Sequence, residues 1–151
     1  MQSKLWKILQ HGNLEELKAL SDKMPWETFL ILLQTSHRRS GDTAVHMSSR
    51  HNQLDMLIWL HEACHLQLEI LNLEGKTPLH EAASTCNHNI VKYLLSCGVN
   101  VDPLKRAGWT PLMMAATKVD NLTTVNLLID FGAKIELVNK VSPLPRYSVY
   151  S

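Results

Sequence analysis

The chain has 151 residues, 45% of them hydrophobic and 19% charged, a composition typical of a soluble globular domain and not of a disordered segment. Its formal net charge of +1 provides no general attraction to nucleic acid or to an anionic membrane. The longest apolar stretch, residues 29–33, is far shorter than the roughly 20 residues of a membrane span, so no membrane partner is expected.

Residues 1–40 contain three predicted helices. Apolar residues recur at helical spacing over residues 5–9 and 12–20, which predicts a helix pair. A third helix is predicted over residues 25–34, with a buried stripe formed by Trp26, Phe29, Leu30 and Leu33. Charged residues interrupt the apolar positions near the start, so no signal peptide is expected.

The rest of the chain repeats itself. Three similar segments begin at Gly41, Gly75 and Gly108, at spacings of 34 and 33 residues. Each is followed by a second apolar block, at residues 56–60, 90–95 and 124–129, and the last two blocks end in Gly98 and Gly132. The period predicts three copies of one structural unit.

Each part of this unit indicates a local structure. Thr77-Pro78 and Thr110-Pro111 predict helix starts, because threonine caps free backbone N–H groups and proline suits the first helical turn. A short turn then leads to a second, apolar helix that ends at a left-handed glycine. The segment after that glycine alternates apolar and polar residues, which predicts an extended arm containing a turn.

The pattern Gly-x-Thr-Pro-Leu-His-x-Ala-Ala, followed by a Val/Leu-rich helix and glycine, resembles the ankyrin repeat. The resemblance implies an all-α solenoid of stacked antiparallel helix pairs joined by projecting β-turn or hairpin arms. It divides the chain into repeats at residues 41–74, 75–107 and 108–140. Several positions depart from the pattern: Ala44 replaces proline, Ser48-Ser49 replace the alanine pair, Cys64 replaces the closing glycine, and Met113 replaces histidine.

The resemblance also gives an interpretation of the two ends. Residues 1–40 are expected to form N-terminal capping helices, because an ordinary terminal repeat would leave its apolar face in water. Residues 141–151 are expected to form a tail, either disordered or the beginning of a truncated further repeat.

The function that the resemblance implies is that of a non-enzymatic scaffold or adaptor that binds another protein. No catalytic, cofactor, metal or small-molecule site is expected. The family's usual contact positions, on the arms and the exposed side of the first helices, correspond here to Arg39, Asp42, Arg50, His51, Leu73, Glu74, Lys76, Ser84, Thr85, Arg106, Trp109, Thr117 and Lys118.

Other functional classes have weaker support. No nucleophile, phosphate-binding or metalloprotease motif is present, and His46 and His80 share a repeated position at which the family's histidine bonds to neighbouring backbone. A local basic patch leaves nucleic-acid binding as the alternative function, although nucleic acid is not the expected partner. The close spacing of His61, Cys64 and His65 suggests a metal site, but a closed zinc site needs about four ligands.

Two further expectations concern partner and location. Residues 101–115 resemble the corresponding segment of an ankyrin repeat protein linked to alanyl-tRNA synthetase and its proofreading, which makes that enzyme a candidate partner. Within this segment, Trp109 is either the anchor of the interface or a packing residue at the repeat edge. The odd number of cysteines, three, fits a reducing compartment, so a cytoplasmic or nuclear location is expected.

Overall fold

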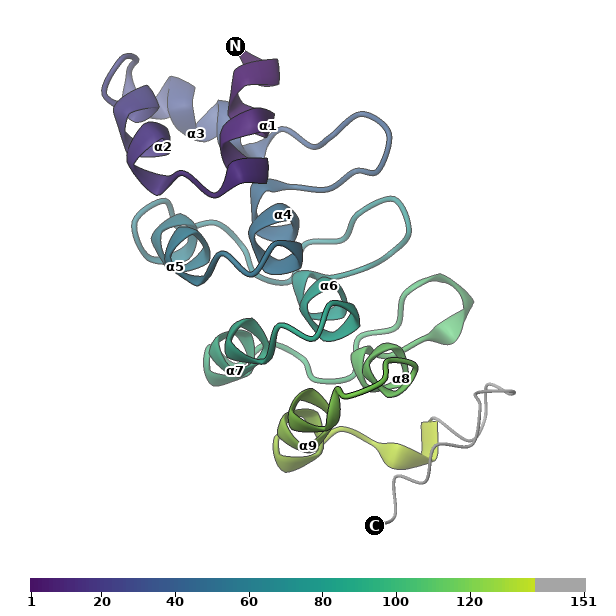
Figure 1. The fold of residues 1–151 in the computed structure, drawn as a ribbon. Helices are drawn as coiled ribbons and strands as arrows, with labels where there is room; N and C mark the ends of the chain where they lie inside the picture. Colours follow the sequence, from purple (N-terminus) through teal and green to yellow (C-terminus); the bar gives the residue numbers. More distant parts are fainter. Residues whose placement is uncertain (138–151) are drawn as a thin grey trace.

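Short helices stacked in two rows form most of the molecule (Figure 1). The computed structural model describes residues 1–137, and within them the structure is all-helical, without strands, as the sequence predicts. The α-helices are α1 (Gln2–His11), α2 (Leu14–Ser21), α3 (Trp26–Gln34), α4 (Ala44–Arg50), α5 (Leu54–Glu62), α6 (Pro78–Ser84), α7 (His88–Ser96), α8 (Pro111–Ala116) and α9 (Leu122–Asp130).

One row consists of α1, α4, α6 and α8, each packed against the next (Figure 1). The helices α4, α6 and α8 are called the inner helices below. Each of them packs against the helix that follows it in the chain, so that α5, α7 and α9 lie in the second row, and these three are called the outer helices below. None of the helices among residues 1–137 has the length and apolar character needed to cross a membrane.

The inner helices begin where the threonines predict. The Thr77 and Thr110 hydroxyl groups accept hydrogen bonds from the backbone N–H groups of His80 (3.4 Å) and Met113 (3.2 Å). Pro78 is the first residue of α6, where its missing N–H costs no helical hydrogen bond. Thr43 occupies the same position before α4, although alanine and not proline follows it.

A repeated amide side chain connects successive layers at the turn before each outer helix. Asn87 Nδ2 donates to the backbone carbonyls of Ser49 (2.9 Å) and Arg50 (3.0 Å) at the end of α4. Asn121 Nδ2 donates to the Ala83 carbonyl of α6 (3.1 Å), and Gln53 Nε2 donates to the Gln10 carbonyl of α1 (3.2 Å). Each amide thus satisfies a carbonyl that the end of the preceding layer's helix leaves free.

The outer helices end as predicted in two of the three repeats. Gly98 and Gly132 adopt left-handed conformations, with φ of 83° and 92°. In the first repeat, Cys64 stands where the glycine is expected, and its side chain is buried among apolar residues. The left-handed residue there is His65, one position later, with φ of 54°.

The third helix forms where expected, but its buried stripe differs from the prediction. Phe29 and Leu33 are buried, whereas Trp26 is 42% exposed. The Trp26 ring leans against Phe29 (centroid distance 5.6 Å) and meets Trp59 of α5 edge-on (6.4 Å). Trp26 therefore covers the edge of the core and is not enclosed by it.

Three arms, residues 37–42, 72–76 and 105–109, project from the same side of the stack (Figure 1). A backbone hydrogen bond closes each arm, for example from Asn72 N–H to the Lys76 carbonyl (3.0 Å) and from Lys105 N–H to the Trp109 carbonyl (3.0 Å). Gly41 has φ of 71°, and a Cβ there would lie 2.7 Å from the Leu73 backbone nitrogen. Glycine thus allows neighbouring arms to approach closely.

The predicted tail, residues 141–151, and residues 138–140 of the predicted third repeat lie outside the described residues.

Candidate functional site

The predicted contact residues lie on or beside the arms and the inner helices, with different exposure. Asp42 is buried, with 2% of its surface exposed. The partly buried residues are Arg50, Lys76, Ser84, Trp109 and Thr117. The exposed residues are Arg39, His51, Leu73, Glu74, Thr85, Arg106 and Lys118.

The two repeated histidines connect each inner helix to the next arm. His80 Nδ1 accepts from the Thr77 backbone N–H (3.1 Å), so Nε2 carries the proton and donates to the Trp109 carbonyl (2.9 Å). His46 bonds in the same way to the backbones of Thr43 (3.2 Å) and Lys76 (2.9 Å). These contacts confirm the predicted bonding of this histidine to neighbouring backbone.

Burial keeps both imidazoles neutral. It lowers the pKa of His80 to about 4, against the raising effect of the hydrogen bond to the Trp109 carbonyl. Burial also lowers the pKa of His46 below its usual value. A neutral ring fixed at both nitrogens serves to position the backbone of the next arm.

Met113 replaces the histidine in the third repeat and performs half of its role. Its sulfur accepts from the Thr110 backbone N–H (3.4 Å), which satisfies the start of α8. A thioether has no hydrogen to donate, so the connection that His46 and His80 make to the following arm has no counterpart at Met113.

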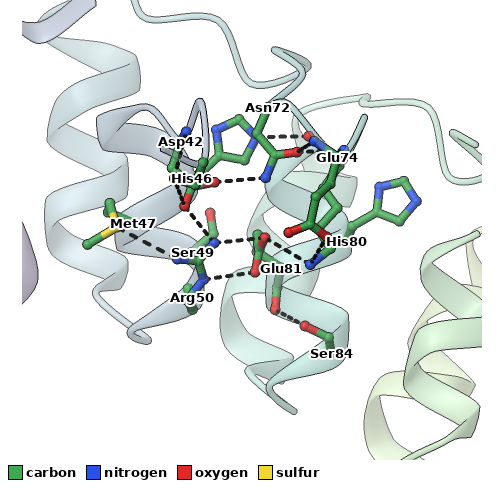
Figure 2. A network of polar contacts seen from close by, with 12 residues as sticks. Asp42, His46, Met47, Ser49, Arg50, Asn72, Glu74, His80, Glu81 and Ser84 are labelled. Atoms are coloured by element: carbon green, nitrogen blue, oxygen red, sulfur yellow. Dashed lines mark hydrogen bonds and ion pairs between the residues drawn. The ribbon is translucent and has the colours of Figure 1, made fainter. Parts of the chain in front are cut away.

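A network of charged groups joins the first two repeats (Figure 2). Arg50 Nη2 lies 2.8 Å from Asp42 Oδ2 and 2.9 Å from Glu81 Oε1, while Arg50 Nε donates to Glu81 Oε2 (2.9 Å). Hydrogen bonds from Asn72, Ser40 and Arg50 lower the pKa of the Asp42 carboxyl, although its burial alone would raise it. The guanidinium therefore pairs with two buried carboxylates that belong to different repeats.

The second arm takes part in the same network. Asn72 Nδ2 donates to Asp42 Oδ1 (2.8 Å), and Asn72 Oδ1 accepts from the backbone N–H groups of Glu74 and Lys76 (both 3.0 Å). Lys76 Nζ lies 2.9 Å from Glu74 Oε2 and 3.7 Å from Glu81 Oε1. Asp42, Arg50 and Lys76 thus already have intramolecular partners, and their role in binding another protein stays a prediction.

Neighbouring arms are also joined directly through their backbones. Leu73 N–H donates to the Ser40 carbonyl (2.9 Å), and Arg106 N–H donates to the Glu74 carbonyl (3.1 Å). The three arms therefore form one continuous edge, on which the side chains of Leu73, Glu74 and Arg106 are exposed.

A hollow of about 240 Å³ lies where the third arm meets α6 and α8, and it is called the arm hollow below. It brings together four predicted contact residues, Ser84, Trp109, Thr117 and Lys118, with Lys105 and Met114, which were not among the predicted contacts. Lys105 Nζ lies 5.9 Å from the centre of the Trp109 ring, within the range of a cation–π contact.

Residues whose close spacing suggested a metal site have other contacts in the structure. Cys64 is buried in the core, and burial raises the pKa of its thiol to about 11. His61 Nδ1 lies 3.1 Å from the Leu66 carbonyl. Among residues 1–137, no three His, Cys, Asp or Glu side chains are grouped as metal ligands would be.

Comparison with known families accounts for this architecture. A family model described as ankyrin repeats (3 copies) matches residues 55–139, more than half of the chain. The chain belongs to the ankyrin repeat family. A second model, ankyrin repeats (many copies), matches residues 5–61, so the likeness extends over α1 and α2. Neither model is that of an enzyme, and ankyrin repeats indicate a protein–protein interaction module.

Similar proteins include much longer chains. The rabbit (Oryctolagus cuniculus) ankyrin repeat, SAM and basic leucine zipper domain-containing protein 1 is 43% identical over 68 residues, which cover 40% of this chain and 14% of that protein. The mouse (Mus musculus) B-cell lymphoma 3 protein homolog is 33% identical over 101 residues, 64% of this chain and 22% of that protein. The matched regions therefore span less than a quarter of these relatives.

Proposed function

We propose that this chain binds another protein through the continuous edge of its three arms and the adjoining surface of the inner helices, without catalysing a reaction. The observation that carries the proposal is the pair of backbone hydrogen bonds between neighbouring arms, from Leu73 to Ser40 and from Arg106 to Glu74. Because these bonds hold the arms side by side, exposed side chains from different repeats can contact one partner together.

Side chains of the inner helices also fix the positions of the arms. The histidine bonds at Lys76 and Trp109 fix two arms to the preceding inner helices, and the Arg50 network joins the first two repeats. A surface that is already ordered loses less conformational entropy on binding, which favours affinity. Exposed Leu73 and Arg106, a large apolar group and a guanidinium, have the chemistry that protein interfaces use.

Affinity capture with the full 151-residue chain tests the proposal. The bait is compared with a double arm variant, Leu73→Ser with Arg106→Ala, and with a matched control on the outer helices, Leu122→Ser with Lys92→Ala. All four residues are exposed. A partner that the arm variant loses and the control retains supports binding at the arms. Equal retention by both variants would show that the interface lies elsewhere.

The finer proposal is that alanyl-tRNA synthetase is such a partner. Its support is the resemblance of residues 101–115, which include the third arm and the start of α8, to a protein linked to that enzyme. Purified alanyl-tRNA synthetase mixed with the immobilised chain should be retained, and the arm variant should reduce its retention. No retention at micromolar concentrations would remove this candidate.

We also propose a cytoplasmic or nuclear location. Its support is that Cys64, Cys86 and Cys97 are all unpaired thiols. Fluorescence imaging of the tagged chain, with fractionation as a second method, tests this location; recovery in the medium or the secretory pathway would contradict it.

A further inference from the structure

Two apolar side chains line the arm hollow, and they are called its floor below. They are Trp109 and Met114, both partly buried and both contributed by the third repeat. The volume, about 240 Å³, is below the roughly 300–1,000 Å³ of pockets that enclose whole small-molecule ligands. A space of this size suits one or two side chains of a larger partner.

Positively charged residues also lie at the hollow, and they are called its rim below. Lys105 and Lys118 line it, and the exposed Arg106 follows Lys105 on the same arm. Within the part of the chain that the structure describes, no carboxylate lies within 4.0 Å of the charged nitrogens of these three residues. Their charges are therefore available to an incoming group.

Three acidic side chains of the neighbouring elements are already engaged. Glu74 pairs with Lys76 at 2.9 Å, and Glu81 is buried beside Arg50. Asp102 accepts a hydrogen bond from the Lys134 backbone N–H at 3.1 Å. These three carboxylates thus contribute to the fold, while the charged residues that line the hollow are Lys105 and Lys118.

We propose that the arm hollow binds an acidic peptide segment of the partner protein, with one apolar side chain against Trp109 and Met114 and flanking carboxylates beside Lys105 and Lys118. This inference rests on the proposed function and identifies the chemistry of its partner. The Ser84 and Thr117 hydroxyl groups also line the hollow; they donate to the carbonyls of Glu81 (3.0 Å) and Met114 (2.8 Å), so their oxygens can accept hydrogen bonds from peptide N–H groups. Opposite charge at the rim increases the association rate and excludes basic segments.

Nucleic acid is the less favoured occupant of this surface. A single-stranded nucleic acid needs a basic groove that follows several successive phosphates, together with several stacking aromatic residues. Here one aromatic residue, Trp109, lines the hollow, together with two lysines. The charge complementarity is local and matches two or three carboxylates.

Fluorescence anisotropy with two labelled peptides tests the proposal on the full chain. The acidic probe has the sequence Gly-Asp-Glu-Leu-Phe-Glu-Asp-Gly, and the control probe replaces each acidic residue with lysine. Binding of the acidic probe alone is expected, with affinity that falls as salt rises. Lys105→Glu with Lys118→Glu should weaken it at least tenfold, and Trp109→Ala should weaken it at least fivefold. The matched controls, Lys92→Glu and Phe131→Ala, change exposed residues of the outer row and should leave it unchanged.

Circular dichroism melting of each variant separates lost binding from lost folding, and Trp109→Phe provides a milder change at the floor. The proposal is overturned if the acidic probe does not bind, if the double lysine variant binds it equally, or if a 20-nucleotide single strand binds more tightly and displaces it. A captured partner that is lost with Leu73→Ser and Arg106→Ala but retained by the double lysine variant would also overturn it. That last result would leave the proposed function intact.

Discussion

At the scale of single residues, His80 combines two structural tasks that are usually separate. Its ring completes the cap of α6 and also bonds to the next repeat at Trp109. The same side chain therefore couples formation of a helix to its stacking. Such a residue affects binding only through the positions of the arms.

His80→Ala should lower the free energy of unfolding by about 2–3 kcal/mol, because it leaves a backbone N–H and a carbonyl without their partners and creates a buried cavity. Urea denaturation measures this change. His51→Ala is the control: His51 is exposed, so its replacement should change stability by less than about 0.5 kcal/mol. Equal stability of the two variants would show that the bond to Trp109 contributes nothing.

The same histidine predicts a pH dependence. Its folded pKa of about 4 lies below the unfolded value of 6.5, so the unfolded chain binds a proton first as the pH falls. The free energy of unfolding is therefore highest above about pH 6.5 and decreases toward pH 4. Protonation of His80 accounts for a decrease on the order of 3 kcal/mol. The lowered pKa of His46 acts in the same direction. The pKa of Asp42 is also lowered, so the stability that this carboxylate contributes is present above its unfolded value of 3.8 and is lost only below that pH.

Urea titrations between pH 7 and pH 4.5 test this dependence, with His80→Gln as the comparison. The glutamine variant should be less stable at pH 7 and should lose less stability on acidification. Parallel curves for the two proteins would mean that His80 does not cause the effect.

At the scale of elements, the starts and ends of the helices that follow the repeat pattern could be predicted from the sequence, whereas a residue that departs from the pattern gave no such indication. Threonine and proline predicted the starts of α6 and α8, and glycine predicted the end of α7. The left-handed conformation of Cys86, with φ of 61°, has no signal in cysteine itself. The same conformation recurs at the equivalent turn positions of the other repeats, Asn52 (56°) and Asp120 (59°), whose residue types do favour it.

The charged network shows why the candidate site was only partly predictable. Sequence comparison placed Arg50 and Asp42 on the arms and inner helices, but Glu81 pairs with Arg50 across 31 positions of the chain. Asn72 was not among the predicted contact residues, although its amide bonds to Asp42. Pairing between side chains of different repeats depends on stacking geometry, which a one-dimensional pattern does not contain.

Arg50→Ala should destabilise the chain by about 2–3 kcal/mol, because two buried carboxylates lose their shared cation. The part of Arg50 that remains exposed to solvent makes the loss smaller than for a fully buried pair. Arg50→Lys should recover only part of it, since an ammonium group cannot reproduce the planar fork between Asp42 and Glu81. Thermal melting of the three proteins measures the order, and full recovery by lysine would contradict the role assigned to the fork.

At the scale of the whole molecule, the main contacts between the described helices join adjacent layers. α6 lies between α4 and α8, while α4 lies between α1 and α6 (Figure 1). In such arrays, stability is approximately the sum of the repeats and their interfaces. Local stability therefore depends on how many connections each layer makes.

Hydrogen exchange should consequently differ between the second and third repeats. The amides of α6 and α7 are expected to be better protected than those of α8 and α9, because His80 donates to the following arm and Met113 cannot. Exchange measured by mass spectrometry on peptides from each helix provides the comparison, with His80→Met as the control variant. This substitution should reduce the protection of α6 toward that of α8. If α8 and α9 are protected as strongly as α6 and α7 in the unmodified monomer, the missing donor at Met113 does not determine local stability.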